Sequence, residues 1–296
     1  MSATFLRIDD LYKSYGPKLV LDNIDLAVDK GELCTVVGPS GCGKSTLLRQ
    51  ILGEEQPDAG TVKLEGVEVG HPDTRRGIVF QRYSLFPHLT VLGNVLLGPR
   101  LTQGPVARWR RRRELREEAM EYLTRMRLAE HAHKYPHELS GGMQQRVAIA
   151  QAMILKPQVL MMDEPFGALD PDTREAMQVL LLQLWEQQRM TVFFVTHDLE
   201  EAVFLGTRIL VLSQYYQDDR GESAGVARGA KIVADYQLPR SAVATDVKRS
   251  PEFTELVARI RREGFSPDIR RHVNEFNLKH PDSFRTLTAE ECRTPT

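Results

Sequence analysis

The sequence predicts an α/β fold with a mixed sheet, an antiparallel β subdomain, a helical insertion and a small C-terminal extension. Three observations support this prediction. Short β-type runs at residues 159–162, 192–195 and 209–212 alternate with helical stretches, as expected for a sheet of mainly parallel strands. Residues 4–30 alternate between apolar and polar positions, which is typical of antiparallel strands. The pattern is helical from about residue 91 to 155, between the β-type runs.

Smaller elements complete the prediction. Residues 60–70 favour a hairpin, and residues 76–80 favour a short strand that ends at Gln81. The polar, glycine-containing segment 214–230 predicts a long exposed hairpin connection. After it, we expect an outer strand at residues 231–236 and a helix at residues 251–263 capped by Ser250, and the last ten or so residues are expected to be frayed.

The composition is that of an ordinary globular protein. The chain has 296 residues, of which 42% are hydrophobic and 27% charged, and its formal net charge is −1. This balance gives no sign of a nucleic-acid partner, because such proteins usually present a basic face. The three cysteines, Cys34, Cys42 and Cys292, show no paired spacing, which fits free thiols in a reducing compartment.

No targeting or membrane-spanning segment is expected. The first ten residues lack the charged start and apolar stretch of a secretion signal. No apolar run approaches the roughly 18–20 residues that cross a bilayer. If the protein serves a membrane process, another chain must supply the spanning helices.

The segment GPSGCGKST is the strongest functional signal, because it fits the phosphate-loop pattern GxxxxGK[ST] between an apolar strand and a helix. Its glycines let backbone N–H groups converge on an anion, and the following helix adds its positive dipole end. A lysine charge then serves the β- and γ-phosphates, and a serine hydroxyl ligates Mg²⁺. The predicted phosphate-binding residues are Gly38, Pro39, Ser40, Gly41, Cys42, Gly43, Lys44, Ser45 and Thr46, with Ser45 also a metal ligand.

Two acids follow the apolar run 159–162. Asp163 is expected at the carboxyl end of a buried strand, where it can hold Mg²⁺ through water. Glu164 comes next and can polarise the attacking water as a general base. An exposed acidic turn is the alternative interpretation.

A second anion site is predicted at a helix start. Ser140 is a good N-cap, and Gly141 and Gly142 leave the first backbone N–H groups of the helix accessible. By residue type alone, an ordinary capped helix with a flexible entry explains the same pattern.

The string LSGGMQQR, which contains Ser140, Gly141, Gly142 and Gln144, closely resembles the signature sequence of ATP-binding cassette (ABC) ATPases. The other motifs of that family are present in the family's order over roughly residues 5–213. The resemblance implies an ATPase with a P-loop NTPase core at residues 1–213, a helical subdomain at about 88–155 and a C-terminal extension at 214–296. ATP and Mg²⁺ are the implied cofactors.

The resemblance also implies roles for single residues. Tyr15 resembles the aromatic residue that stacks on adenine, although a strand aromatic that packs on the core is the alternative. Gln81 resembles the glutamine that ligates Mg²⁺ and senses the γ-phosphate, and a solvated glutamine is the alternative. His197 resembles the switch histidine that contacts the γ-phosphate and orients Glu164, and a structural histidine is the alternative. Asp170 resembles the residue that crosses the dimer interface, although by residue type alone it predicts a helix start with Pro171 at the first position.

The family mechanism that this resemblance implies is a cycle of dimer closure and opening. Two cassettes pair head to tail, and the signature serine of one caps the γ-phosphate held by Lys44 of the other. ATP thereby holds the dimer together, and hydrolysis releases it. The second cassette can be an identical copy or a different chain.

The implied partners are transmembrane permease subunits and an extracytoplasmic solute-binding protein, with the chain held at the cytoplasmic face of the membrane. Tyr83, Leu85 and Phe86 are the candidates for contact with a short helix of the permease, and core packing is the alternative. The segments YQLPR and RSPEF in the tail resemble nitrate, sulfonate and taurine importer ATPases. An exporter or lipid-transport cassette, and a soluble cassette acting on nucleic acid or ribosomes, are the alternatives.

One motif is left over. Arg108 and Arg110–Arg113 form a basic run that includes Trp109 and is followed by glutamates. A solvated helix face with ion pairs between neighbouring turns is the ordinary interpretation. Contact of Trp109 and the arginines with a membrane surface is the alternative.

Overall fold

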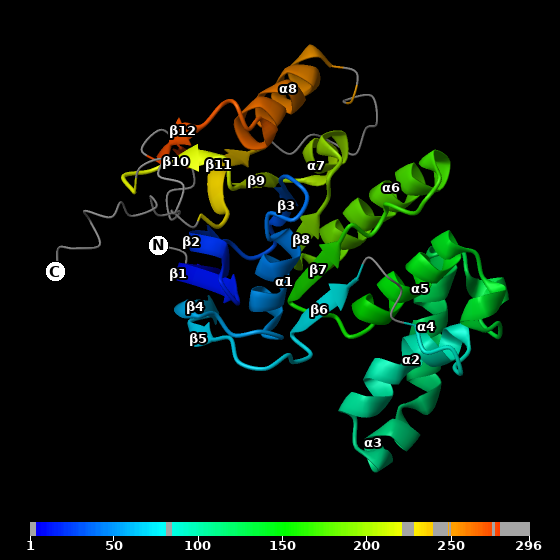
Figure 1. Cartoon of the computed structure of the whole chain (residues 1–296). Coiled ribbons are helices and arrows are strands. Elements are labelled where there is room, and N and C mark those ends of the chain that lie inside the picture. The colour runs from blue at the N-terminus through cyan, green and yellow to red at the C-terminus, as the bar shows by residue number, and fades with distance from the viewer. Residues whose placement is uncertain are drawn as a thin grey trace. The chain divides into compact units, whose positions relative to one another are not determined.

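A computed structural model describes residues 4–80, 85–220, 228–238, 248, 250–273 and 276–278. The chain divides into two compact units (Figure 1). The first unit combines residues 1–72 with residues 191–296, and the second unit comprises residues 73–190.

The first unit contains an antiparallel sheet with the strand order β2-β1-β4-β5. β1 pairs with β2 from Leu6↔Val28 to Tyr15↔Lys18, which confirms the two strands predicted for residues 4–30. The predicted hairpin at residues 60–70 is also confirmed, with Glu65 and Gly66 at positive φ in its turn. The strands are β1 (Leu6–Tyr15), β2 (Lys18–Val28), β4 (Ala59–Leu64) and β5 (Val67–Glu68).

A mixed sheet forms the centre of the first unit, in the order β13-β11-β9-β3-β8. β3 is parallel to both β8 and β9, whereas β11 is antiparallel to β9. All five residues of β3 and of β8 are buried, which explains why both strands are mainly apolar. The strands are β3 (Leu33–Val37), β8 (Thr191–Val195), β9 (Arg208–Ser213), β11 (Lys231–Gln237) and β13 (Asn277–Leu278).

Three helices accompany this sheet: α1 (Lys44–Leu52), α7 (Leu199–Leu205) and α8 (Pro251–Phe265). The helix predicted at residues 251–263 is confirmed, and the Ser250 hydroxyl accepts a hydrogen bond from the Phe253 N–H at 3.2 Å. α8 approaches β9 so closely that a Cβ on Gly264 would lie 2.2 Å from Val211 Cγ1. A glycine is therefore required at this contact.

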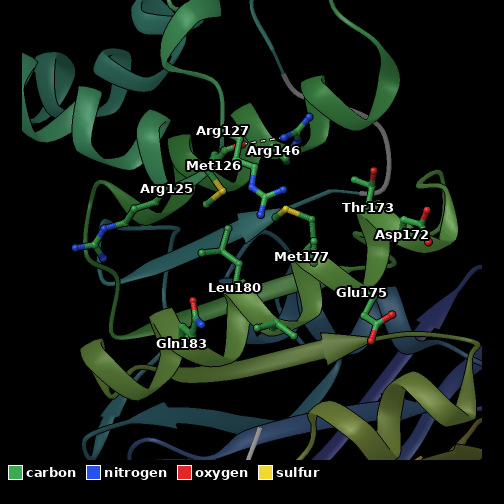
Figure 2. A pocket seen from close by; sticks show the side chains of 12 residues that line it. Arg125, Met126, Arg127, Arg146, Asp172, Thr173, Glu175, Met177, Leu180 and Gln183 are labelled. Atoms are coloured by element: carbon green, nitrogen blue, oxygen red, sulfur yellow. Dashed lines mark hydrogen bonds between the residues drawn. The ribbon is translucent and has the colours of Figure 1, made fainter. Parts of the chain in front are cut away.

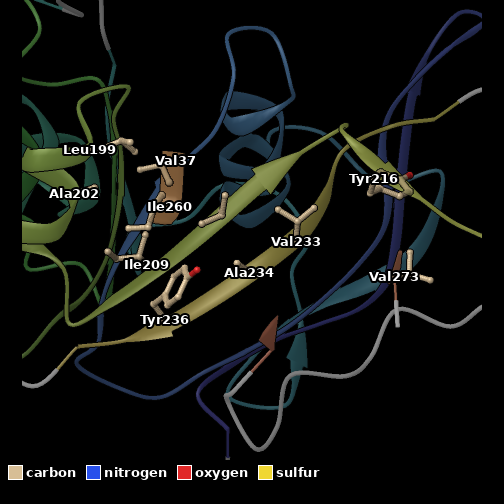
Figure 3. Close-up of a cluster of buried hydrophobic side chains, with 11 residues drawn as sticks. Val37, Leu199, Ala202, Ile209, Tyr216, Val233, Ala234, Tyr236, Ile260 and Val273 are labelled. Atoms are coloured by element: carbon tan, nitrogen blue, oxygen red, sulfur yellow. The ribbon is translucent and has the colours of Figure 1, made fainter. Parts of the chain in front are cut away.

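The residues after 213 pack into the same core as the nucleotide-binding strands. Figure 3 shows Val37 of β3 and Leu199 of α7 in one cluster with Tyr236 of β11 and Ile260 of α8. The connection after β9 is less exposed than predicted, because Tyr216 is buried and β10 (Tyr216–Gln217) pairs in parallel with β12 (Arg271–His272). β11 is not the outer strand either, since β13 pairs beyond it. Residues 221–227 of the connection and the last 18 residues of the tail lie outside the described part.

The second unit consists of two parallel strands and a group of helices. β6 pairs with β7 from Arg76↔Val159 to Val79↔Met162. The helical stretch that was predicted from residue 91 is confirmed, although the charged helix expected at 105–127 is broken at Arg111. The elements are β6 (Arg76–Val79), α2 (Val91–Thr102), α3 (Pro105–Arg110), α4 (Arg112–Arg125), short 3-10 turns at Ala129–His131 and Pro136–Glu138, α5 (Gly141–Met153), β7 (Val159–Asp163) and α6 (Pro171–Gln188).

Candidate functional site

The phosphate loop runs from the end of β3 to the start of α1. The Lys44 side chain lies within this loop, where its Nζ donates hydrogen bonds to the carbonyls of Gly38 at 2.8 Å and Pro39 at 2.9 Å. Because an ammonium group has three N–H donors, these two bonds fix its position and leave one donor for an anion. The Ser45 side chain, one residue further, is exposed.

Two of the loop glycines are required by their surroundings. A Cβ on Gly38 would lie 2.0 Å from the carbonyl oxygen of Leu212 at the end of β9. Gly43 has φ of +107°, and a Cβ there would lie 2.9 Å from Val20 Cγ1. The loop is therefore packed against β9 and β2. Close approach to a backbone carbonyl explains the glycine at position 38, and a left-handed backbone beside a side chain explains the glycine at position 43.

His197 lies beside the start of the phosphate loop. Val36 of β3 is directly opposite Val195 of β8, so the chain leaves both parallel strands at the same edge of the sheet. The loop that carries His197 is held on both sides. The Thr196 hydroxyl donates to Glu201 at 2.6 Å, and Asp198 caps α7 by accepting from the Glu200 N–H at 2.9 Å.

Tyr15, the candidate for adenine contact, ends β1 with its side chain 42% exposed. Its hydroxyl donates a hydrogen bond to the Glu55 carboxylate, and the Lys13 ammonium lies 5.7 Å from the ring centroid. The exposure does not fit the alternative of an aromatic residue packed in the core. The ring is therefore held at its polar end by Glu55 and is covered on one face by Lys13.

The acidic pair belongs to the second unit. Asp163 is the last residue of β7 and is partly buried, as predicted for the end of a buried strand. Glu164 follows with φ of +46°, a left-handed conformation that non-glycine residues rarely adopt. Such a backbone conformation is costly and is most often found at functional sites, where the surrounding structure imposes it.

The signature segment has the predicted capped helix start. The Ser140 hydroxyl accepts a hydrogen bond from the Met143 N–H at 3.3 Å at the beginning of α5. A Cβ on Gly142 would lie 2.9 Å from Leu169 Cδ2, so this glycine also packs closely. The Gln144 amide donates to the carbonyls of Pro136 at 3.0 Å and Leu139 at 3.2 Å, and thereby holds the chain that leads into the signature.

Asp170 begins α6 in the same way, because its carboxylate accepts from the Thr173 N–H at 3.0 Å. This hydrogen bond lowers the pKa of Asp170, so its carboxyl group is ionised at neutral pH. The prediction of a helix start is confirmed, and the exposed carboxylate is accessible from outside the chain.

Arg146 is the last residue of the signature string, and the sequence predicted no function for it. Its guanidinium donates from Nη1 to the Met126 carbonyl at 2.9 Å and from Nε to the Gly142 carbonyl at 3.4 Å. Burial and the neighbouring Arg127 lower the pKa of Arg146. Figure 2 shows both arginines beside a cavity of 480 Å³, with Met177 of α6 among its other lining residues. Arg146 therefore joins the end of α4 to the first turn of the signature helix.

A second cavity of the same unit, of 350 Å³, lies beside the start of α2. Its lining residues include His88, Leu89, Thr90, Leu92, Gly93, Leu96, Arg100, Arg112, Arg116, His133 and Tyr135. We call this cavity the α2 groove. It contains both imidazoles and arginines, so its walls are basic in character.

The loop before α2 is held by Asn94, a fully buried residue that the sequence analysis did not single out. The Asn94 amide donates to the carbonyls of Phe86, Leu89 and Thr90 at 3.0–3.1 Å and accepts from the Phe86 N–H at 2.7 Å. Phe86 is 42% exposed, and Leu85 is partly buried. Phe86 is therefore not a core residue. Gln81 and Tyr83 lie outside the described residues.

No helix among the described residues is long and apolar enough to cross a membrane. Within the same part of the chain, no group of three or more His, Cys, Asp and Glu side chains could hold a metal ion. The Ser45 hydroxyl and the Asp163 carboxylate are hard oxygen donors, which suit an Mg²⁺ ion that keeps several water ligands and binds to phosphate. The donor types therefore fit the predicted Mg²⁺.

Comparison with known proteins decides the family. Residues 21–167 match the family model described as ABC transporter. Nitrate import ATP-binding protein NrtD of Synechocystis sp. is 41% identical over 252 residues, covering 84% of this chain and 90% of the relative. The chain belongs to the ABC transporter family. It is an ATPase that binds ATP with Mg²⁺, the subunit type that works at the membrane with permease partners.

Other relatives and solved structures support the same family assignment. Taurine import ATP-binding protein TauB of Chromobacterium violaceum is 48% identical over 193 residues, covering 65% of this chain and 72% of the relative. The dimeric structure of the ABC transporter cassette MJ0796 has a TM-score of 0.64 at 32% identity and covers 80% of this chain and all of that chain. A dimeric post-hydrolysis state of the same cassette, bound to ADP and Pi, has a TM-score of 0.61 at 34% identity and covers 69% of this chain and 93% of that chain. The predicted α/β cassette fold is thus confirmed.

Proposed function

We propose that this ABC ATPase drives the import of a small solute of the nitrate, sulfonate or taurine type through partner permease subunits. The observation that carries the proposal is that one chain combines a phosphate loop ordered by Lys44 with a signature helix capped by Ser140, the two segments predicted to bind anions. Relatives named as nitrate and taurine import ATP-binding proteins, at 41% and 48% identity, support the choice of solute.

In this proposal the first unit binds the nucleotide. Lys44 uses its remaining N–H for the β- and γ-phosphates, and the backbone amides at the start of α1 surround them. Ser45 ligates Mg²⁺, Tyr15 stacks on the adenine, and His197 contacts the γ-phosphate. The bound Mg²⁺ neutralises charge on the phosphates, which is the chemistry that it contributes.

The second unit supplies the acids. Asp163 holds Mg²⁺ through water, together with Gln81, and Glu164 takes the proton from the attacking water. The left-handed backbone at Glu164 supports this role, because a fixed backbone also limits where the carboxylate can lie. Hydrolysis requires this positioning, because enzymes lower the activation barrier of phosphoryl transfer mainly by orienting the reacting groups and by stabilising charge in the transition state.

The nucleotide also joins two cassettes. ATP carries about four negative charges, and one phosphate loop neutralises only part of them. The Ser140 hydroxyl accepts from the Met143 N–H and still has its own proton to donate to a γ-phosphate on a second cassette. Gly141, Gly142 and Gln144 complete this signature surface, and Asp170 lies at the dimer interface. ATP binding thus closes the dimer, and hydrolysis reopens it.

We assign residues 1–213 to the ATPase domain, with a helical subdomain at about 88–155, and residues 214–296 to a C-terminal extension. The α2 groove, with Phe86 and Leu85 on the loop before it, receives a short helix of the permease. An extracytoplasmic solute-binding protein completes the system. The chain itself remains at the cytoplasmic face of the membrane.

Glu164→Gln tests the hydrolysis step. We expect it to lower ATP turnover by about 10²–10⁴-fold, the usual contribution of a general base, while ATP binding is retained. In ATP and Mg²⁺, size-exclusion chromatography should then detect a stable dimer that the wild-type protein forms only transiently. Phosphate release measures turnover directly.

The matched control is Glu175→Gln, which removes an exposed carboxylate from α6 of the same unit. It is expected to retain wild-type turnover and to form no lasting dimer. Wild-type hydrolysis by Glu164→Gln would overturn the general-base role. A Glu164→Gln dimer that forms equally well without ATP would overturn the role of the nucleotide in closure.

A further inference from the structure

The end of α2 and the short helix α3 carry large apolar side chains in contact with solvent. Leu101 is 75% exposed, Val106 is 64% exposed and Trp109 is 77% exposed. Val106 and Trp109 are three residues apart in α3, so they lie on one face of this helix. Neighbouring exposed apolar residues usually mark an interaction site. We call these three residues, together with Arg110–Arg113, the α3 patch.

The same stretch is strongly basic. Residues 100–116 contain seven arginines and a single acidic residue, Glu114, in a chain whose formal net charge is −1. Arg111 pairs with Glu114 at 2.8 Å, and Arg113 pairs with Glu117 at 2.8 Å. Arg110 and Arg112 have no carboxylate partner among the described residues. The positive charge is therefore concentrated here and only partly compensated.

We propose that the α3 patch binds the anionic headgroup surface of a lipid bilayer, with Trp109 inserted at the boundary between headgroups and hydrocarbon. Arginines at such a surface are attracted by the negative potential of anionic lipids. Tryptophan and aliphatic side chains favour the interface itself, where their apolar parts leave water. The combination of exposed apolar residues and arginines on adjacent turns fits this occupant.

The position of the patch in its unit agrees with this proposal. Figure 1 shows α3 at the end of the helical group, beyond α2 and α4. Arg112 belongs both to the patch and to the lining of the α2 groove. If the groove receives a permease helix, the patch faces the same membrane. Only this last step depends on the proposed function, because affinity for lipid requires no permease.

Nucleic acid is the less suitable partner. A nucleic-acid surface would use the arginines, but it offers nothing for Leu101 and Val106, which are aliphatic and cannot stack on bases as Trp109 can. An anionic bilayer accounts for both kinds of side chain. Each arginine contributes about fivefold to vesicle binding, so the contact is reversible and orients the subunit without anchoring it.

The chain contains its own probe for the experiment. It has two tryptophans, Trp109 in the patch and Trp185, which is only 4% exposed in α6. The full-length protein is titrated at low salt with vesicles of phosphatidylcholine alone or of phosphatidylcholine with phosphatidylglycerol, whose anionic headgroups give the surface a negative potential. We expect a blue shift of tryptophan emission and co-sedimentation with the anionic vesicles only. Both are expected to weaken as salt is added.

Two variants assign the effect to the patch. Trp109→Phe is expected to abolish the blue shift while co-sedimentation persists. Arg110→Gln with Arg113→Gln is expected to lower vesicle binding about thirty-fold, from about fivefold for each charge. Neither arginine lines the α2 groove, so this test does not depend on permease docking. The matched control, Arg261→Gln with Arg262→Gln, removes the same charge from exposed positions of α8 and is expected to bind vesicles as the wild type does.

Circular dichroism of each variant establishes that it is folded. The proposal is overturned if Trp109 emission is the same with both kinds of vesicle, or if the two double variants lose binding equally. Binding to a short RNA duplex without binding to anionic vesicles would assign the arginines to nucleic acid and would also overturn it.

Discussion

Substitution of Asp235 tests how the extension is joined to the nucleotide-binding sheet. Asp235 lies on β11, and its carboxylate accepts two hydrogen bonds from Arg208 of β9, at 2.9 Å from Nε and 2.6 Å from Nη2. Both side chains are almost completely inaccessible to solvent. The guanidinium also donates to the Ala27 carbonyl and to Glu32, at 2.5 and 3.2 Å. All its nitrogens are therefore engaged inside the protein.

Asp235→Asn keeps the size of the side chain but removes its charge. The substitution leaves Arg208 buried with Glu32 as its remaining charged partner, and the Glu32 side chain is 18% exposed. Removal of one member of a buried pair usually costs 3–5 kcal/mol. Because Glu32 compensates part of the charge, we expect a loss at the lower end, about 3 kcal/mol in the free energy of unfolding. For a chain of this size the melting temperature falls by about 6–10 °C.

Urea unfolding followed by circular dichroism, without nucleotide, measures this loss. Glu255→Gln is the matched control, because it breaks an Arg259–Glu255 pair of 3.2 Å that is exposed on α8. This variant is expected to change stability by less than about 0.5 kcal/mol. Arg208→Met combined with Asp235→Leu is expected to restore most of the loss, because both fully buried charges are removed and Glu32, which is 18% exposed, keeps its hydrogen bond from the Asp29 N–H. A loss below about 1 kcal/mol for Asp235→Asn would refute the reasoning.

Three further predictions concern single side chains. Asp170→Ala removes the cap of α6 and is expected to lower the urea midpoint of unfolding, whereas Asp170→Asn keeps an acceptor for the Thr173 N–H and is expected to unfold near the wild-type midpoint. Equal losses for the two variants would contradict the capping role. Cys42 is buried, and burial raises the pKa of its thiol. We therefore expect iodoacetamide to modify Cys42 at least about tenfold more slowly in the native protein than in urea, and mass spectrometry measures both rates. Burial also raises the pKa of Asp25 to about 6. Between about pH 4 and 6 the folded protein therefore keeps a proton on Asp25 that the unfolded chain has released, and the free energy of unfolding falls as the pH rises through this range. Asp25→Asn retains an acceptor for the Asp10 N–H and is expected to flatten this fall in melting temperature, and an unchanged pH profile would contradict the assignment.

Local motifs were sufficient to predict much of the fold and the local geometry of the phosphate loop and the helix caps. The phosphate loop is recognisable because glycine and lysine are needed at fixed spacings, and the structure gives a reason for each: Gly38 touches the backbone of β9, and Lys44 bonds to its own loop. Caps such as Ser140 and Asp170 are equally local, since donor and acceptor are three residues apart. Interactions between residues a few positions apart depend only on the residue types and their spacing, so the sequence alone predicts them.

Contacts between distant residues could not be predicted in this way. Nothing in the order of residues pairs Tyr216 with Arg271, or brings Asp235 to Arg208. A single buried asparagine such as Asn94 is also indistinguishable in sequence from a surface one, although its amide makes four hydrogen bonds that hold the loop before α2.

The amino-acid sequence by itself determined the family and the order of most of the longer helices and strands, because these follow from short patterns with strict steric and charge requirements. Only the tertiary structure decided that the segment after Ser213 packs into the core of the first unit, and that Trp109 stays in solvent while Trp185 is buried. Burial is a property of what surrounds a side chain, and those surroundings come from parts of the chain that are remote in sequence.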